Sequence, residues 1–457
     1  MKDMVAIILA AGEGTRMKSG LPKVLHQVCG KPMIEYVIDR LEELNIDKKI
    51  VIIGYKGNLV KETLGKKVDY IWQKEQLGTG HALAQCREIL AKFKGDLLVL
   101  SGDTPLLTTQ TLKRLIEVQR EKNALATILT AILKPPTGYG RVVRHGDGTI
   151  RKIVEEEDAT IIELANEEVN AGTYCFKKEA IFQALEKIRP ENVQEEYYLT
   201  DAIEVLTRKG HRVEACTTDE ADEIIGINSR KDLSLATKIM REHILDRLML
   251  NGVTIIDPLT TTIDREVEIG RDTIIYPFTI VEGKTKIGQD CIIGPAVQIK
   301  DSKIAHKVEI KNSSVQNSII ESEARIGPYA HLRPESRIGK KAKIGNFVEI
   351  KKSTIGKESK VSHMSYIGDA TLGENINIGA GTITCNYDGF KKYPTYIEDK
   401  VFVGSNTNFI APVKIGKGAV IGAGSTITED VPPYALAIAR GRQRNIKGWA
   451  KKKTQRK

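Results

Sequence analysis

The amino-acid sequence predicts a chain built from two different parts, an α/β Rossmann-like domain followed by a long parallel β-helix. In residues 1–228, short apolar runs alternate with amphipathic stretches, which is typical of a mostly parallel sheet covered by helices. In residues 229–250, apolar residues recur every three or four positions, which indicates one linker helix. Residues 251–457 contain a six-residue repeat, and this period is typical of stacked coils.

The six-residue period is the most regular feature of the sequence. A glycine often follows the repeated aliphatic residue, as in IGQDCI and IGKKAK. With three hexads per coil, residues 251–430 make about ten coils, each burying its aliphatic residues against the next. The repeat runs through Ile269, Ile275, Val281, Ile287, Ile293 and Ile299, then Ile326, Leu332, Ile338, Ile344 and Ile350, then Ile355, Val361 and Ile367, and finally Val403, Phe409, Ile415, Ile421 and Ile427.

The apolar runs of the first part predict its strands. They are Val5–Leu9, Ile50–Ile53, Leu97–Leu100, Leu125–Leu129 and Ile224–Ile227, and segments such as Pro32–Leu44 and Gly80–Ala91 are interpreted as helices. Ligands of open parallel sheets bind beyond the carboxyl ends of the strands. We therefore expect the functional residues of this domain just after its strands.

Composition limits the kind of protein and its compartment. No run of 18 apolar residues occurs, so we expect no membrane span. The six cysteines form no CxxC pair, which favours a reducing cytoplasm over a disulfide framework or a zinc site. Residues 440–457 hold nine cations and no acid, so a net charge of +10 leaves about +1 elsewhere. We interpret this basic segment as a solvated tail rather than a polyanion-binding arm, and no nucleic-acid-binding motif is present.

Three features of the first part point to a nucleoside triphosphate and a metal. The segment LAAGEGTRM (9–17) follows the first strand, where glycines let backbone N–H groups approach phosphate and Arg16 adds charge. Lys23 comes shortly after this loop. Asp103 follows the strand at 97–100, a position that suits a Mg²⁺ ligand or, alternatively, a simple turn or helix cap. The dinucleotide fingerprint fails at Met17 and the P-loop pattern fails at Pro32.

Coil arithmetic brings charged residues of the second part together. Coils of 18 residues stack at about 4.8 Å, and Arg333 and Lys351 are 18 residues apart, each directly after an inward aliphatic residue. Two cations stacked so closely repel unless an anion lies beside them. The pair therefore indicates a phosphate site, although surface residues can also coincide at the coil period by chance.

A second set of residues falls near a break in the rhythm. Ser405 and Ala423 are 18 residues apart, while His363 and Ala380 are 17 apart across a five-residue step. The hexads are interrupted at 385–396, and insertions in solenoids often form functional loops. Histidine suits general-base work at neutral pH, although an exposed histidine is by itself more often inert.

The motifs resemble those of a known family. LAAGEGTRM and the following PKVL resemble the signature of sugar-phosphate nucleotidyltransferases. Over residues 1–450 the chain is similar to the bacterial bifunctional enzymes that combine N-acetylglucosamine-1-phosphate uridylyltransferase with glucosamine-1-phosphate N-acetyltransferase. The matching stretches are EQLGTGHA (75–82), GDTPL (102–106), GYGRV (138–142), IVEEEDA (153–159) and NAG (170–172), with Gln73 and Asn228.

The resemblance implies roles for individual residues. It places Leu9, Ala10, Ala11, Gly12, Lys23, Gln73, Gly78 and Thr79 at the uridine nucleotide, Gly140, Glu155 and Asn170 at the sugar, and Asp103 and Asn228 at Mg²⁺. It makes His363 the catalytic base. It places Arg333, Lys351, Tyr366 and Asn377 at glucosamine 1-phosphate, and Ala380, Asn386, Tyr387, Ser405, Ala423 and Arg440 at acetyl-CoA. Ser101 departs from the pattern, since many relatives have an aromatic residue there.

The resemblance also implies the reactions and the assembly. Acetyl-CoA would acetylate glucosamine 1-phosphate, and UTP would convert the product to UDP-N-acetylglucosamine with release of pyrophosphate. The β-helix would be left-handed and would pack as a homotrimer, with acetyl-transfer sites between subunits. One alternative is a single-activity nucleotidyltransferase whose β-helix only oligomerises it. A non-catalytic binding module is the other, and it leaves Asp103, Asn228 and His363 without a purpose.

Overall fold

The structure is a computed structural model that describes residues 3–454 and divides into two compact units. The first unit ends at Met240 and the second begins at Arg241. The boundary falls inside helix α8 (Arg230–Leu250), where the sequence pattern places a linker helix over 229–250.

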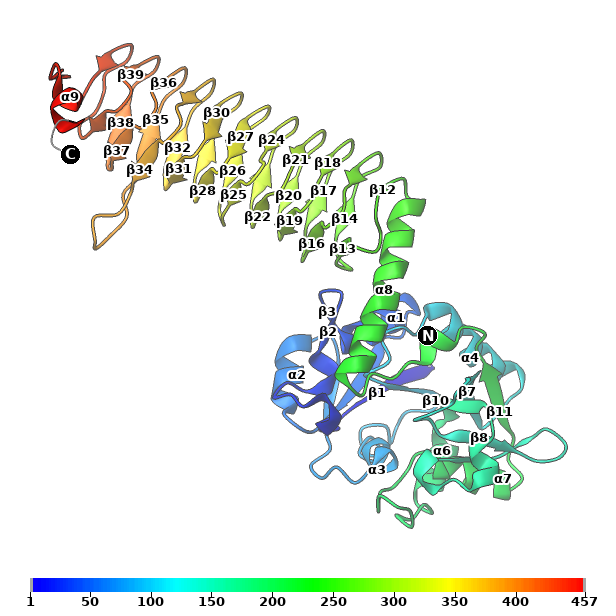
Figure 1. Ribbon diagram of the computed structural model, residues 1–457. Helices are drawn as coiled ribbons and strands as arrows, with labels where there is room; N and C mark the ends of the chain where they lie inside the picture. The colour runs from blue at the N-terminus through cyan, green and yellow to red at the C-terminus, as the bar shows by residue number, and fades with distance from the viewer. Residues whose placement is uncertain (1–2, 455–457) are drawn as a thin grey trace. The chain divides into compact units, whose positions relative to one another are not determined.

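The first unit is built on a nine-stranded sheet (Figure 1). Its main order is β11-β7-β10-β6-β1-β4-β5, with β8 and β9 attached beside β10. All pairs along this order are parallel except those made by β10. The strands are β1 (Met4–Ala10), β4 (Lys48–Ile53), β5 (Asp69–Trp72), β6 (Asp96–Ser101), β7 (Ala126–Ile132), β8 (Arg141–Arg144), β9 (Ile150–Val154), β10 (Glu168–Lys177) and β11 (Val213–Thr217), besides a small hairpin of β2 (Gln27–Val28) and β3 (Lys31–Pro32).

Helices cover this sheet because its strands are apolar on both faces. In β1, six of seven residues are buried. The helix expected at 32–44 is confirmed as α1, whereas that expected at 80–91 is helical only to Ala84 and continues as turns. The helices are α1 (Met33–Glu43), α2 (Gly57–Leu64), α3 (Thr79–Ala84), α4 (Thr109–Glu121), α5 (Ile161–Leu164), α6 (Lys178–Leu185) and α7 (Asp201–Arg208), with 3₁₀ turns η1 (Thr15–Met17), η2 (Lys23–Leu25), η3 (Glu156–Asp158) and η4 (Ala221–Ile224).

The strand expected at Ile224–Ile227 is wrong. This run begins in η4 and continues as a buried loop, in which Ile224 and Ile227 are 2% and 0% exposed. The Ile227 N–H donates to the Asp103 carbonyl at 3.0 Å instead of joining the sheet. The apolar pattern thus reports burial correctly but not strand pairing, and this loop carries Asn228 to the Asp103 segment.

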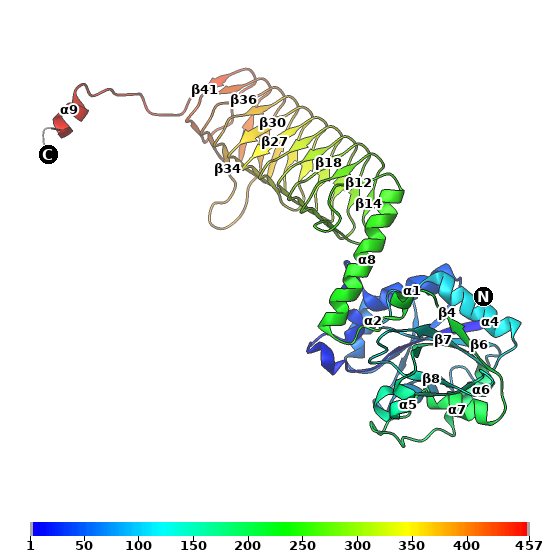
Figure 2. The ribbon, with the colours of Figure 1, turned by 45° about the vertical axis from the view of Figure 1, so that its right-hand side comes forward.

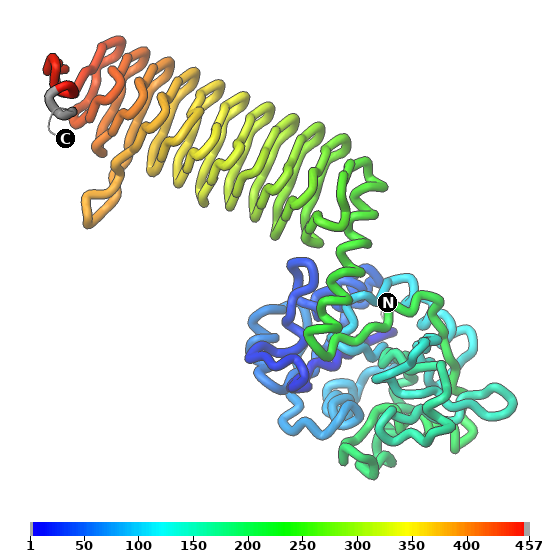
Figure 3. The backbone as a smooth tube through the Cα atoms, viewed as in Figure 1, coloured from blue at the N-terminus to red at the C-terminus, as the bar shows by residue number. Residues whose placement is uncertain are grey.

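The second unit is a stack of coils with three parallel sheets as its faces (Figures 1 and 3). Face 1 contains β12 (Thr254–Ile255), β15 (Ile274–Ile275), β18 (Ile292–Ile293), β21 (Glu309–Ile310), β24 (Arg325–Ile326), β27 (Lys343–Asn346), β30 (Lys360–His363), β33 (Asn377–Ile378), β36 (Phe402–Val403), β39 (Val420–Ile421) and β41 (Leu436–Ala437). Face 2 contains β13 (Thr262–Ile263), β16 (Ile280–Glu282), β19 (Gln298–Lys300), β22 (Ser314–Gln316), β25 (His331–Leu332), β28 (Glu349–Lys351), β31 (Tyr366–Gly368), β34 (Ile383–Cys385), β37 (Asn408–Ile410) and β40 (Thr426–Ile427). Face 3 contains β14 (Glu268–Ile269), β17 (Lys286–Ile287), β20 (Lys303–Ile304), β23 (Ile319–Ile320), β26 (Arg337–Ile338), β29 (Thr354–Ile355), β32 (Ala370–Leu372), β35 (Thr395–Ile397) and β38 (Val413–Ile415).

The repeated aliphatic residues point inward and hold the coils together. All those of the predicted register are at most 4% exposed, except Ile269 in the first coils, which is half-buried. From β12 to β37, each strand pairs in parallel with the strand three places later along the chain, and β39 pairs with β41. Together with the α/β unit, this arrangement confirms the predicted fold class.

Beyond the last coil the chain forms a short helix, α9 (Trp449–Thr454), after an exposed segment at 441–448 (Figure 2). Residues 456 and 457 of the predicted basic tail lie outside the described residues. Within residues 3–454, no helix is both long and apolar enough to cross a membrane.

Candidate active sites

In the first unit, the carboxyl ends of β1, β5 and β6 surround a cavity of about 210 Å³. They lie at the same edge because these strands run parallel. Nine sequence-predicted residues line it: Leu9, Ala10, Ala11, Gly12, Lys23, Gln73, Gly78, Thr79 and Asp103. Glu196, Gln76, Val24, Ala82 and Ser101 line it too. Val24, Gln76 and Ala82 belong to the quoted motifs without an assigned role, whereas Glu196 lies outside every quoted motif. Arg16 is exposed on η1 and is not among the lining residues.

Asp103 is buried and its carboxylate is held by a lysine. Lys23 Nζ forms an ion pair with Asp103 and donates to Asn228 Oδ1 at 3.0 Å. Burial opposes ionisation, but the charge and hydrogen bond of Lys23 lower the pKa of Asp103. The two predicted metal ligands thus face one ammonium group. A carboxylate and an amide oxygen that already accept a cation form a donor set that fits Mg²⁺.

Ser101 also contacts Asp103. Its Oγ–H donates to Asp103 Oδ1 at 2.6 Å, while Lys23 occupies the other oxygen. The residue that departs from the family pattern therefore orients the predicted metal ligand.

The loop before α3 needs glycine at position 78. Gly78 has a φ of +103°, and a Cβ there would lie 2.7 Å from the Tyr197 carbonyl oxygen. Any side chain would be both strained and in collision with this backbone. Gln73 Nε2 donates to the Gly78 carbonyl at 3.0 Å, and the Leu199 N–H donates to Thr79 Oγ1 at 3.0 Å. Three predicted nucleotide-binding residues are thereby fixed in one tight loop.

The three residues predicted for the sugar form a second cluster in this unit. The Asn170 N–H donates to the Gly140 carbonyl at 2.9 Å, and a Cβ on Gly140 would lie 3.1 Å from Glu155 Oε2. Burial raises the pKa of Glu155, whose Oε1 accepts from Thr200 at 3.0 Å. Segments far apart in sequence thus place a carboxylate, an amide and a buried glycine together.

In the second unit, several candidates share one position of successive coils. Asn346, His363, Ala380, Ser405 and Ala423 each stand two residues after an inward aliphatic residue, at the corner after face 1. Arg440 follows in the last coil and donates to the Ala423 carbonyl at 2.6 Å. The prediction that residues 17 or 18 positions apart lie one above another in adjacent coils is therefore confirmed for this row of residues.

His363 is exposed, and its ring is oriented by a neighbour that the sequence analysis missed. Its Nδ1 forms a hydrogen bond with Asn346 Oδ1. Because an amide oxygen only accepts, Nδ1 carries the proton in this contact and Nε2 is left as the basic nitrogen. Asn346 precedes His363 by 17 residues, so the coil period could have identified it.

Arg333 and Lys351 stack on face 2 as predicted, but each has a carboxylate partner. Arg333 Nη1 donates to Glu349 Oε1 at 2.8 Å, and Lys351 Nζ lies 3.2 Å from Asp369 Oδ2. The protein itself supplies the anions that the stacked cations require. The inference that the stack demands an anionic ligand is therefore wrong, and a phosphate role for the pair rests on the family resemblance.

The remaining candidates lie around these two sets. Tyr366 is on face 2 beside Glu349, and Asn377 is on face 1 beside Lys360. Asn386 is buried at the start of the interrupting loop, where exposed Tyr387 pairs with Lys392 in an antiparallel bridge. The loop projects from the coils between β34 and β35 (Figure 1).

Known protein families match segments of both units. A nucleotidyl transferase family matches residues 5–224, and a bacterial transferase hexapeptide family of six repeats matches residues 266–301 and 394–429. Residues 314–387 match a family described as the GMPPB C-terminal domain.

Relatives match over the whole chain. The "Bifunctional protein GlmU" of Halalkalibacterium halodurans is 52% identical over 99% of this chain and 100% of its own length. Proteins of the same name from a Geobacillus species and from Shouchella clausii are 52% and 50% identical. The match to the Geobacillus protein covers 98% of this chain and 98% of that protein. The match to the Shouchella clausii protein covers 99% of this chain and 100% of that protein.

Proposed function

The chain belongs to the family of bifunctional GlmU proteins, and from this premise we propose that it makes UDP-N-acetylglucosamine by two consecutive transfers. The second unit transfers the acetyl group of acetyl-CoA to glucosamine 1-phosphate. The first unit then transfers a uridylyl group from UTP to N-acetylglucosamine 1-phosphate. The observation that carries this assignment is that each unit holds its own polar constellation, Lys23 with Asp103 and Asn228 in one and His363 with Asn346 in the other.

In the first transfer, the amine nitrogen of glucosamine attacks the thioester carbonyl carbon. The C–S bond breaks, an amide forms, and coenzyme A leaves as the thiol. Asn346 holds His363 with Nε2 free to accept the amine proton, which can then pass to the departing sulfur. Arg333, Lys351, Tyr366 and Asn377 bind the sugar phosphate, and Ala380, Asn386, Tyr387, Ser405, Ala423 and Arg440 line the acetyl-CoA side.

In the second transfer, a phosphate oxygen of the sugar phosphate attacks the α-phosphorus of UTP, and the bond to pyrophosphate breaks. Leu9, Ala10, Ala11, Gly12, Gln73, Gly78 and Thr79 bind the nucleotide, and Gly140, Glu155 and Asn170 bind the sugar. Asp103 and Asn228 would hold Mg²⁺, which supplies positive charge to the phosphate oxygens when bound. Lys23 contacts both of these side chains and must release them to reach the phosphates.

Product analysis with substrates omitted in turn tests this function. Acetyl-CoA with glucosamine 1-phosphate should give N-acetylglucosamine 1-phosphate, and adding UTP should then give UDP-N-acetylglucosamine and pyrophosphate. Removing divalent metal with EDTA should stop only the uridylyl transfer. If no acetylated sugar forms, the chain is instead a single-activity nucleotidyltransferase whose β-helix serves oligomerisation.

We also propose that the protein is a cytoplasmic homotrimer with acetyl-transfer sites between subunits. The residues assigned to the sugar phosphate lie on two faces of the β-helix, Arg333, Lys351 and Tyr366 on face 2 and Asn377 on face 1. A second copy beside this corner would enclose a ligand that one copy leaves open. Light scattering coupled to size-exclusion chromatography should give three times the chain's 50.6 kDa mass, and a monomer that acetylates would contradict the arrangement.

Replacing Ser101 by alanine should lower the apparent affinity of the enzyme for Mg²⁺ in uridylyl transfer. Without its hydroxyl, Asp103 loses the hydrogen bond that fixes Oδ1. Groups that orient metal ligands typically affect affinity about 10- to 100-fold, so we expect about a tenfold rise in the Mg²⁺ concentration for half-maximal rate. Ser101→Thr retains the hydroxyl and should behave as the unmodified enzyme, and an unchanged Mg²⁺ titration in Ser101→Ala would remove this role.

Replacing Asn346 by alanine should slow acetyl transfer without abolishing it. The histidine stays in place but loses the contact that orients its ring. We expect kcat to fall about tenfold, less than the factor of about 10²–10⁴ that a general base contributes. Steady-state kinetics of both transfers will measure the fall in kcat of acetyl transfer. Uridylyl transfer serves as the control, because its rate should be unchanged.

A further inference from the structure

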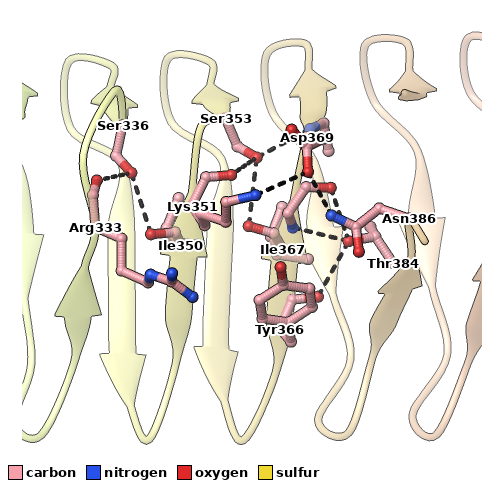
Figure 4. A network of polar contacts seen from close by, with 12 residues as sticks. Arg333, Ser336, Ile350, Lys351, Ser353, Tyr366, Ile367, Asp369, Thr384 and Asn386 are labelled. Atoms are coloured by element: carbon pink, nitrogen blue, oxygen red, sulfur yellow. Dashed lines mark hydrogen bonds and ion pairs between the residues drawn. The ribbon is translucent and has the colours of Figure 1, made fainter. Parts of the chain in front are cut away.

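Asp369 is the central acceptor of a polar network on three consecutive coils (Figure 4). It lies directly after β31, and its Oδ2 accepts from Lys351 Nζ of the preceding coil at 3.2 Å. The same oxygen accepts from Asn386 Nδ2, which lies directly after β34. One carboxylate therefore joins a residue assigned to the sugar phosphate and a residue assigned to acetyl-CoA.

Asp369 also holds both ends of the interrupting loop. Asn386 begins the loop, and the Thr395 N–H, at its end, donates to the Asp369 carbonyl at 3.2 Å. Between them, the Tyr393 N–H donates to the Asn386 carbonyl at 2.8 Å. The side chain of Asp369 thus binds the first residue of the loop, and its backbone carbonyl binds the residue at the end of the loop.

The network is largely shielded from solvent. The side chains of Lys351 and Asp369 are 17% and 14% exposed, and Asn386 is 7% exposed. Hydrogen bonds to charged groups are stronger than neutral ones, and shielding makes their loss more costly. These contacts are therefore strong enough to fix the positions of the groups that they join.

The loop contributes a second lysine to the surroundings of Lys351. Lys351, Asp369 and Lys392 are among the residues that line one cavity of about 400 Å³. Contact with Lys392 and the charge of Asp369 raise the pKa of Lys351, while the charge of Lys351 lowers the pKa of Lys392. Asp369 supplies the negative charge that lets the two lysines approach each other.

We propose that Asp369 is a positioning residue that fixes Lys351 and the loop 386–394 in one geometry, so that the sugar-phosphate and acetyl-CoA subsites are assembled together. The proposal rests on the proposed acetyl transfer for its kinetic consequence only. Without the carboxylate charge, Lys351 and Lys392 repel each other, and the loop loses the side-chain contact at its first stem.

The test replaces Asp369 by asparagine, which keeps the size but removes the charge. We expect KM for glucosamine 1-phosphate and for acetyl-CoA each to rise about tenfold, the usual effect of losing one charge-assisted hydrogen bond, with kcat changed less than about threefold. Uridylyl transfer should be unchanged. A merely structural role would instead lower the amount of active enzyme and leave both KM values unaltered.

The matched control is Asp301→Asn. Asp301 also follows a strand of face 2 directly, has a φ of +47° against +48° for Asp369, and accepts a backbone N–H from Lys284 at 3.0 Å. It lies in a coil that carries none of the assigned residues. Its replacement should leave both KM values unchanged.

Limited trypsin digestion gives a readout that does not depend on activity. Lys391 and Lys392 are exposed in the loop, and mass spectrometry can follow cleavage there. The loop of Asp369→Asn should be cut several times faster than that of Asp301→Asn. If Asp369→Asn does not fold, Asn386→Ala should still accelerate cleavage, because it removes the same stem contact.

The outcomes separate the two proposals. Accelerated loop cleavage in a protein that shows no acetyl transfer would support the positioning role of Asp369 and contradict the proposed acetyl transfer. Unchanged cleavage and unchanged KM values in Asp369→Asn would overturn the positioning role while leaving the acetyl transfer in place.

Discussion

Asp103→Ala is expected to abolish uridylyl transfer while acetyl transfer continues at its full rate. The substitution removes one of the two oxygen ligands proposed for Mg²⁺ and leaves Lys23 with Asn228 as its remaining described partner at this cavity. Losing one preorganised electrostatic group typically lowers the rate about 10²- to 10³-fold. Because this substitution also removes a ligand of the metal, the rate of uridylyl transfer should fall by at least this factor. Coupled pyrophosphate release measures the first reaction, and thiol release from acetyl-CoA measures the second.

A matched variant separates this effect from general damage to the unit. Asp39→Ala removes a carboxylate from a lysine in the same unit, since Lys31 Nζ lies 2.6 Å from Asp39 Oδ2. That variant should keep its uridylyl transfer. Normal uridylyl transfer in Asp103→Ala would instead show that this carboxylate has no part in the reaction.

His363→Ala is expected to cause the opposite separation. Acetyl transfer should fall by about 10²–10⁴, the usual contribution of a general base, and uridylyl transfer should be retained. Because position 363 is exposed and the inward residues of its coil are untouched, folding should be preserved. The release of the coenzyme A thiol, followed at saturating substrates, is the measurement.

Two further variants sharpen this result. His331 is also exposed on the β-helix, so His331→Ala controls for the loss of any surface imidazole. Added imidazole should restore part of the activity to His363→Ala if the missing group is a base. Acetyl transfer that is unaffected by His363→Ala would exclude this residue from the mechanism.

The second unit could be predicted closely because its contacts are periodic. A residue and the one 17 or 18 positions later pair in adjacent coils, as Asn346 does with His363, so counting along the chain identifies neighbours. The same counting reaches Asp369, which lies 18 residues after Lys351, but not Glu349, which lies only 16 residues after Arg333. Both carboxylates are missed when cations are compared with cations alone, and the stacked pair then points to an external anion although the chain already provides one.

The first unit could be predicted less completely because its contacts are not periodic. Lys23 and Asn228 are 205 positions apart, and no spacing rule relates them. The run at Ile224–Ile227 is apolar because it is buried, and an apolar run of four residues fits a strand and a buried loop equally well. Glu196 reaches the cavity through packing of the Tyr197 segment on the Gly78 loop, which leaves no motif in the sequence.

The coils from β12 to β24 carry none of the residues assigned to acetyl transfer, and each pairs only with its neighbours. A complete coil could therefore be added to or removed from this stretch without altering the geometry within the candidate site. A single residue inserted within one hexad would instead rotate the following aliphatic side chains out of the interior. Length variation in the second unit should accordingly occur in multiples of a whole coil, or as outward loops at the corners, such as the one that begins at Asn386.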